Sequence, residues 1–199
     1  MSVPPIAVPR PHVKHDNRSM PVQIGQKRQA DFSDPIGMLS DCHRRIESFL
    51  AALLALARGW KGGALDEGAR SSLAKALEYF RQSGPRHTAD EEESLFPRMR
   101  QSEAGEEALR SIEALHADHV VADRAHAEID VLGTRWLTEG RLAEGDAARM
   151  AELLEELSRL YEHHIGVEDR EVFPTAARVL TPEHIASIGE EMAQRRRVE

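Results

Sequence analysis

The sequence of 199 residues contains a single cysteine, Cys42. One thiol cannot form a disulfide within the chain, which excludes the disulfide-stabilised scaffolds of small secreted proteins. The first thirty residues contain no apolar run of the kind found in signal peptides, and no stretch is long and apolar enough to span a bilayer. We therefore expect a cytoplasmic protein that does not bind a membrane.

Aromatic residues make up only 5% of the sequence, and no segment alternates apolar and polar residues between hairpin turns. Instead the chain is rich in Ala, Leu, Glu and Arg, which favour helix. A basic excess is also lacking, because the net charge is −8. This argues against nucleic acid as a partner, since phosphate contacts need a basic surface. The short basic run at 195–197 is expected to be a solvated helix end.

Apolar residues recur at helical spacing in four long segments. Asp34 and Thr181 are placed to cap helices, and Gly84-Pro85 is expected to interrupt the second segment and redirect its continuation. In the third segment the expected core residues are Leu109, Ile112, Leu115, Val120, Ile129 and Leu132. The predicted helices cover about 34–59, 66–99, 106–132 and 144–180, followed by a short helix that begins at 181–183.

Four long amphipathic helices joined by short connections predict an all-α fold, an antiparallel four-helix bundle. We place this bundle at residues 31–180. It would be preceded by an extended arm at 1–30, with His12 and His15 exposed, and followed by a C-terminal helix and basic tail at 181–199.

One motif occurs twice. HTADEEESLFP at 87–97 and HIGVEDREVFP at 164–174 each place a histidine four residues before a glutamate and nine before a Phe-Pro pair. Residues i and i+4 lie on the same face of a helix. His87 with Glu91, and His164 with Glu168, should therefore point into the same space.

The preceding helices repeat as well. LSDCH places His43 four residues after a leucine, and LHADH places His119 in the same way. The offset between the halves is 76 residues for these histidines and 77 for the second pair. A duplicated helical hairpin predicts a bundle with pseudo-twofold symmetry and a site built from both halves.

Four histidines and two glutamates in a bundle core would be costly as free charges, but they could hold metal ions. Imidazole suits Zn, Fe, Cu and Ni. The simplest arrangement is two metals that each bind two imidazoles and share both carboxylates. The order of His before Glu, and the excess of imidazole, distinguish this pattern from ferritin-type sites, which use Glu-x-x-His.

The combined pattern over about 34–180 resembles the hemerythrin-like family, the HHE cation-binding domains. The resemblance implies a four-helix bundle around a non-haem di-iron centre bridged by carboxylates and a solvent-derived oxo or hydroxo group. It further implies that His43 and His87 bind one iron and that His119 and His164 bind the other. Glu91 and Glu168 would bridge the two irons, and zinc is the less favoured metal.

The sequence departs from oxygen-carrying hemerythrins, which have a second histidine on the third helix. Here Asp123 lies four residues after His119 and Leu115 four before it. One iron could bind Asp123 or water, or stay open, which favours turnover or sensing over oxygen carriage. His116 is a competing ligand candidate, and Tyr161 could lie near the metals, although a half-buried aromatic at a helix boundary is the simpler interpretation.

The remaining titratable groups are assigned structural positions. His163 is expected at the surface or beside the ligands, His126 and His184 are expected to be exposed, and Cys42 is expected to point away from the metals. Four further glutamates are interpreted as solvated or capping charges, with a supporting role around the ligands as the alternative: Glu92, Glu93, Glu162 and Glu171.

Three functional hypotheses remain open. The first is a di-iron protein that senses or reacts with dioxygen, peroxide or nitric oxide, or handles iron. The second is an enzyme that turns over peroxide or nitric oxide, and the third is a structural or regulatory bundle that holds zinc or another cation. The expected partner in the first two cases is a small diatomic ligand or peroxide.

Overall fold

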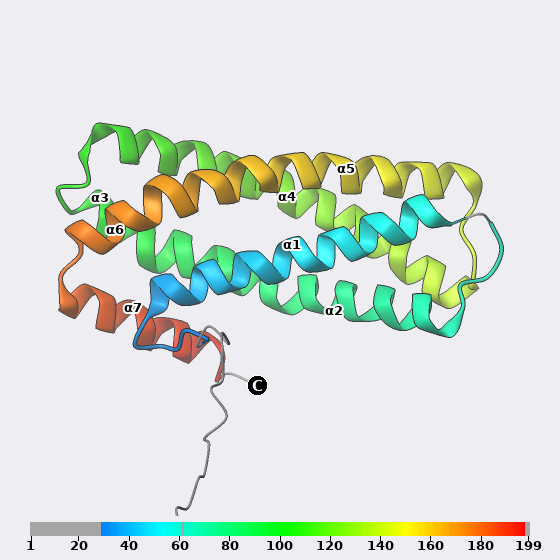
Figure 1. Ribbon diagram of the computed structural model, residues 1–199, viewed down its shortest axis with the longest axis horizontal. Coiled ribbons are helices and arrows are strands. Elements are labelled where there is room, and N and C mark those ends of the chain that lie inside the picture. The colour runs from blue at the N-terminus through cyan, green and yellow to red at the C-terminus, as the bar shows by residue number, and fades with distance from the viewer. Residues whose placement is uncertain (1–28, 61, 198–199) are drawn as a thin grey trace, which may run out of the picture.

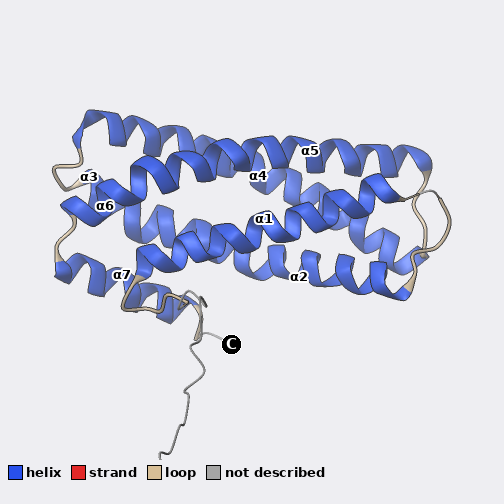
Figure 2. Cartoon of the chain, viewed as in Figure 1, coloured by secondary structure: helices blue, strands red, loops and turns tan. Residues whose placement is uncertain are grey.

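The computed structural model describes residues 29–60 and 62–197. Within these residues the chain is helical and has no strand, and four long helices lie side by side (Figures 1 and 2). The predicted all-α fold is confirmed. The expected arm at 1–30, with His12 and His15, lies outside the described residues except for its last two.

The four long helices form a closed ring of antiparallel neighbours. α1 contacts α2 and α5, and α4 contacts the same two helices. The α1–α2 and α4–α5 connections lie at one end of the bundle, so each helix runs opposite to its neighbours (Figure 1). The bounds are Pro35–Gly59 for α1, Glu67–Ala89 for α2, Gly105–Glu139 for α4 and Glu144–Val167 for α5.

Side-chain caps explain where several helices begin. The Asp34 carboxylate accepts a hydrogen bond from the Gly37 N–H at 3.0 Å, and Asp66 accepts one from Ala69 at 2.7 Å. The predicted end of the third long helix was too early. α4 continues about two turns past Leu132 and ends at Glu139, and the following Gly140 adopts a left-handed conformation (φ 74°).

The predicted interruption at Gly84-Pro85 was wrong. α2 passes through Pro85 and ends at Ala89. Pro85 is exposed, so water can reach the carbonyl of the preceding turn that loses its hydrogen bond. A helical continuation beyond residue 86 was expected, but the π-helix within it was not.

Both halves of the bundle contain a π-helix at the same place in the repeat. After α2 the chain forms η1 (Asp90–Leu95) and α3 (Phe96–Arg100), and after α5 it forms η2 (Glu168–Val172) and α6 (Phe173–Val179). In a π-helix the backbone bonds reach one residue further than in an α-helix. Each Phe-Pro pair then opens a new α-helix, where the missing proline N–H removes no bond within that α-helix.

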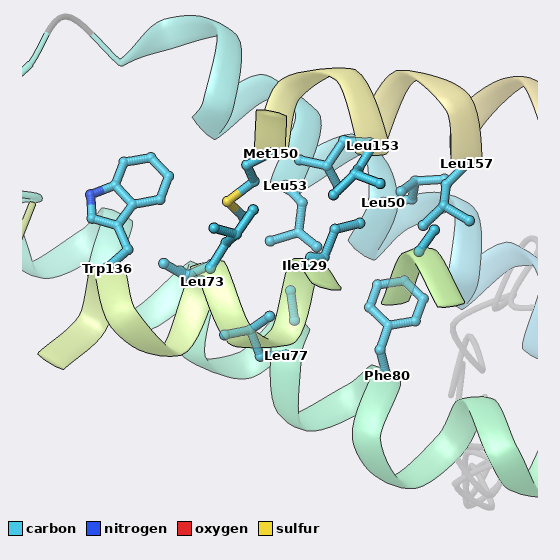
Figure 3. Close-up of a cluster of buried hydrophobic side chains, with 14 of the residues drawn as sticks. Leu50, Leu53, Leu73, Leu77, Phe80, Ile129, Trp136, Met150, Leu153 and Leu157 are labelled. Atoms are coloured by element: carbon cyan, nitrogen blue, oxygen red, sulfur yellow. The ribbon is translucent and has the colours of Figure 1, made fainter. Parts of the chain in front are cut away.

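The core is divided into two apolar clusters by a polar layer. Along α1, Leu39 belongs to one cluster and Ile46 to the other, with His43 between them. Along α4, Leu115 and Ala122 flank His119 in the same way. Figure 3 shows the larger cluster, in which leucines from three helices pack with Trp136 and Met150. Burying this apolar surface on both sides of the layer stabilises the bundle.

One expected core residue of α4 lies elsewhere. Val120 is 40% exposed, whereas Ile112, Leu115, Ile129 and Leu132 are buried as predicted. Leu109 is half-buried and packs against the smaller cluster. Because Val120 directly follows His119, it lies about 100° around the helix from that inward-facing side chain.

The last helix, α7 (Pro182–Arg195), begins at the predicted Thr181 cap and packs against η1 and α1. At Gly189 it approaches the backbone so closely that an added Cβ would collide with the Phe32 carbonyl oxygen. No helix among the described residues combines the length and the apolar character needed to cross a membrane.

The basic run at the end of α7 was expected to be solvated, but two of its arginines form ion pairs with a buried carboxylate. Arg195 and Arg196 both bind Asp90, with N···O distances of 3.0 and 2.6 Å, and the Asp90 side chain is fully buried. Glu191 of α7 also binds Arg98 at 2.7 Å. These contacts hold α7 against η1, the segment that carries Glu91.

Candidate metal centre

The polar layer of the core receives one histidine from each long helix. His43 comes from α1, His87 from α2, His119 from α4 and His164 from α5, and their exposed fractions lie between 1% and 7%. Two glutamates complete the layer, Glu91 from η1 and Glu168 from η2, and both are completely buried.

Each HxxxE pair meets as helix periodicity predicted. The His87 Nε2 atom lies 3.3 Å from Glu91 Oε1, and His164 Nε2 lies 3.3 Å from Glu168 Oε2. Each glutamate stands at or next to the first residue of its π-helix, so the pair spans the junction between the two helix types. The four-residue spacing survives because the side chains still leave from one face.

Each glutamate also reaches a histidine from the other half of the chain. Glu91 Oε2 lies 3.3 Å from His119 Nε2, and Glu168 Oε2 lies 3.1 Å from His43 Nε2. The carboxylates therefore lie between histidines of both halves. The pseudo-twofold arrangement expected from the duplication is present in the contacts themselves.

The ligand-type atoms fall into two overlapping groups. One consists of His43 and His87 with both glutamates, and the other of His119 and His164 with the same glutamates. Within each group the four atoms lie within 4.8 Å of one another. All six residues singled out in the sequence are brought together, and in the pairing that the resemblance implied.

Many of these buried atoms contact only one another and form no hydrogen bond of good geometry among the described residues. They include both carboxylate oxygens of Glu91 and of Glu168, and the Nε2 atoms of His43 and His119. Leaving so many polar atoms unsatisfied in a core would be costly. Their convergence is the arrangement required to hold cations, so the residues present fit a pair of metal ions.

Three carboxylates lie behind the histidines and fix their orientation. Asp169 Oδ1 lies 3.1 Å from the Nδ1 atom of His43, and Glu92 Oε1 lies 2.8 Å from that of His119. Asp118 Oδ2 lies 3.4 Å from Nδ1 of His164. A partner on Nδ1 places the proton there and turns Nε2 toward the centre, as is usual for metal-binding histidines.

These partners were largely missed in the sequence. Glu92 had been assigned a solvated or capping role, with support of the ligands as the alternative, and the structure shows the alternative. Asp169 and Asp118 were not considered. A signal was available, because an acidic residue directly follows Glu91 and Glu168 in both halves, but which histidine it serves depends on helix packing.

Cys42 occupies the position in the first half that Asp118 occupies in the second, directly before the lone histidine. It lies beside His87, not away from the centre as expected. Burial alone would raise the pKa of the Cys42 thiol, but the interactions with His87 and Tyr79 outweigh burial and lower it. Its Sγ atom lies 3.3 Å from the Tyr79 hydroxyl.

In the metal-free protein the carboxylates hold protons on the histidines. Burial opposes the charged form of His43, but the carboxylates of Asp169, Glu168 and Glu91 raise its pKa to about 12. Burial likewise opposes the charged form of His119, but the carboxylates of Glu91 and Glu92 outweigh it and raise the pKa of His119 to about 9. The pKa of Glu91 is correspondingly lowered, despite its burial, by the neighbouring histidines. Protons thus occupy the place that cations would take.

The other candidate ligands stand outside both groups. Asp123 and His116 are exposed, and His116 Nδ1 lies 3.0 Å from Glu92 Oε1. Tyr161 lies nearer, with its ring centroid 6.2 Å from that of His164, and its hydroxyl is 2.9 Å from Nε2 of His126. None of the three belongs to a four-residue group.

Two histidines were placed wrongly in the sequence. His126 and His184 are half-buried, not exposed. His126 packs on Phe80 and Tyr161, and the Nδ1 atom of His184 is buried. His163 is exposed, in agreement with the expectation of a surface position.

Comparison with known proteins now agrees with the geometry. The model of the hemerythrin HHE cation-binding domain matches residues 34–176. The chain belongs to this family. It is also 25% identical over 178 residues to a Haemophilus influenzae protein named "Uncharacterized protein", with 89% of this chain and 99% of that protein aligned. The matched range contains every histidine and glutamate of the two groups, so the hemerythrin-like fold and the cation-binding character hold for this bundle.

The raised histidine pKa values predict opposite effects of pH on the metal-free and metal-loaded protein. The stabilisation that His119 gives the metal-free fold is complete below its ordinary pKa of 6.5 and is lost as the pH rises toward 9. Metal binding instead requires loss of these protons and strengthens with pH. The difference in melting temperature between the metal-loaded and the metal-free protein should increase steadily from pH 6.5 to 9. If the melting temperatures of the two forms changed in parallel with pH, protons and metal would not compete for these histidines. The exposed His163→Gln variant is the control and should give the same pH dependence as the parent.

Removing the carboxylates behind the histidines is expected to weaken cation binding without unfolding the bundle. For Glu92→Gln and Asp169→Asn we expect a loss of affinity of about 10–100-fold, the usual cost of removing such partners. Competition with a chelator of known affinity measures this. The exposed Glu162→Gln variant is the control, and equal affinities for all three variants would show that these carboxylates do not orient the ligands.

Proposed function

We propose that this hemerythrin-like protein is a non-haem di-iron protein that senses or reacts with dioxygen, peroxide or nitric oxide, or handles iron. The observation that carries the proposal is the pair of buried groups, each with two histidines, that share both glutamates. Imidazole and carboxylate together suit iron, and no thiolate belongs to either group, which makes a structural zinc site of the cysteine-rich type a poorer fit.

The chain's own residues would hold and insulate such a pair. Glu91 and Glu168 offer four oxygens between the two sets of histidines, and their negative charges would offset part of the charge of two cations. Asp169, Glu92 and Asp118 keep three imidazoles turned inward. The apolar clusters cover the layer on its two sides along the bundle axis. When bound, two irons would supply one-electron chemistry toward small oxygen or nitrogen oxide molecules.

Metal analysis of protein purified without added metal, together with its visible absorption spectrum, tests the proposal. We expect two irons per chain, one for each group, and absorption bands that disappear in His87→Ala. One zinc per chain, or no metal, would leave the fold unchanged and reject the iron chemistry in favour of a structural or regulatory bundle.

An enzymatic role is the second candidate, favoured by an opening to the centre. A pocket of about 500 Å³ is lined by His87, His119 and His164, so molecules from solvent can reach the histidines. Steady-state loss of peroxide or nitric oxide should then depend on the centre. Consumption that is unchanged in Glu168→Ala would reject turnover at this site.

A further inference from the structure

The opening to the centre is much larger than its proposed small ligands require. We call it the α2–α4 pocket, because most of its lining comes from α2 and α4, with His87, His119 and His164 at the end that meets the centre. Its volume of about 500 Å³ lies within the range of about 300–1,000 Å³ that is typical of sites for organic ligands. A diatomic molecule or hydrogen peroxide would leave most of this space empty.

The walls of the pocket are largely apolar. Leu77 and Phe80 line it from α2, and Ala122 and Ile129 from α4. All four of these side chains also belong to the larger core cluster, and Leu77, Phe80 and Ile129 are labelled in Figure 3, so the pocket is supported by the packed core. A hydrocarbon body that enters the pocket would lose contact with water and gain contact with these side chains.

Two further polar groups of the pocket, the His126 imidazole and the Tyr161 hydroxyl, are uncharged. His126 Nε2 and the Tyr161 hydroxyl form a hydrogen bond of 2.9 Å inside the pocket, and His126 stacks on Phe80 with ring centroids 4.4 Å apart. Burial lowers the pKa of His126 to about 4, so it is neutral at physiological pH. The pair provides hydrogen-bonding groups without a charge that could bind an anion.

The charged residues around the pocket disfavour anions. Arg81 is the only lysine or arginine among the described residues that line it, and its guanidinium is bound to Asp130 at 2.7 Å and Thr134 at 2.6 Å. Against this single cation stand four lining carboxylates: Glu92, Glu93, Asp123 and Asp130. The histidines at the end of the pocket are already paired with carboxylates, at N···O distances of 2.8–3.3 Å. A carboxylate or phosphate ligand would therefore meet the four lining carboxylates and find no cation without an acidic partner.

We propose that the α2–α4 pocket binds an uncharged organic molecule, with an apolar body about as large as one or two fused rings and a single polar group facing the centre. The inference rests on the proposed function, because the polar end is taken to approach metal-bound histidines. It adds the class of molecule that the site selects, a neutral and mainly apolar one.

Equilibrium dialysis of the full chain against 2-naphthol and 2-naphthoate at pH 7 tests the pocket. The two probes share a ring system, but only the second is charged. In both metal-free and iron-loaded protein, we expect saturable binding of one naphthol per chain, stronger than naphthoate binding by about tenfold or more. Absence of saturable binding, or equal binding of naphthoate, would overturn the proposal.

Gly84→Phe provides a blocking variant. Gly84 lines the pocket, and a Cβ at this position meets no atom within 4 Å, so a larger side chain does not force the backbone to move. Replacing a glycine inside a helix also favours folding. We expect naphthol affinity to fall by about tenfold or more, with metal content unchanged. Ala127→Trp, at an exposed lining position of α4, is a second blocking variant.

Gly145→Phe is the matched control. Gly145 is also helical and meets no atom within 4 Å, but it does not line the pocket. Equal affinities in the Gly84 and Gly145 variants would place naphthol elsewhere and overturn the proposal. Because metal content is measured separately, naphthol binding without iron binding would reject only the di-iron function, and iron binding without naphthol binding would reject only the pocket.

Discussion

Replacing Glu91 with glutamine is expected to remove both metal ions from the chain. Glu91 belongs to both four-residue groups and lies 3.3 Å from histidines of each half, His87 and His119. Glutamine preserves the shape of the side chain but removes its charge and one acceptor oxygen. We expect the affinity for each ion to fall by more than the roughly 10–100-fold that follows the loss of an outer partner.

The comparison with a histidine variant makes this prediction specific. His164 belongs to only one of the groups, so His164→Ala should release one ion while the other is retained. Metal content and melting temperature of the two variants, measured side by side, provide the result. Retention of one ion by Glu91→Gln would show that the glutamate is not shared and that the two groups are independent sites.

The double variant Arg195→Met, Arg196→Met is expected to destabilise the fold by about 3–5 kcal/mol, the cost of leaving a buried charge without its partner. The Asp90 side chain is completely buried, and both arginines bind it. For a chain of this size the change corresponds to a decrease in melting temperature of roughly 6–20 °C. Urea denaturation measures the free energy of unfolding directly.

Two further variants identify the cause of this loss. Arg197→Met removes an exposed arginine beside the pair and should have little effect. Adding Asp90→Asn to the double variant should recover part of the stability, because the uncompensated charge is then gone. A double variant as stable as the parent would show that the basic end of α7 is only a solvated tail.

The same contacts link α7 to the metal centre. Asp90 precedes Glu91 in η1, and α7 holds Asp90 from the outside of the bundle. A displaced α7 would therefore release the segment that positions a shared glutamate. We expect the double arginine variant to bind metal more weakly than Arg197→Met does, which the chelator competition used for Glu92→Gln would measure.

Local geometry explains why much of this protein could be predicted. Composition and periodicity indicated helices, and capping residues such as Asp34 and Thr181 marked where two of them begin. Within a helix, the four-residue spacing of His87 and Glu91 places both side chains on one face whatever surrounds them. The duplication then related the two halves, so His43 and His119 could be added.

Other features followed from contacts that no local pattern contains. The sequence predicted a break at Pro85, but α2 continues because Pro85 is exposed. Neither π-helix was predicted, although η1 and η2 carry both shared glutamates. Val120 was expected to be buried and is exposed, and His126 was expected to be exposed and is half-buried. Their burial depends on where neighbouring helices lie.

By itself the sequence determined the all-α bundle, the family and the six histidines and glutamates of its polar layer, because these depend on helix periodicity and on a repeated motif. Only the tertiary structure decided which carboxylate supports which histidine, that α7 holds η1 through Asp90, and that a pocket opens between α2 and α4. Asp169 and His43 are separated by 126 residues, and Arg196 and Asp90 by 106. Such contacts arise from how whole helices pack, and the spacing of residues along one helix does not encode them.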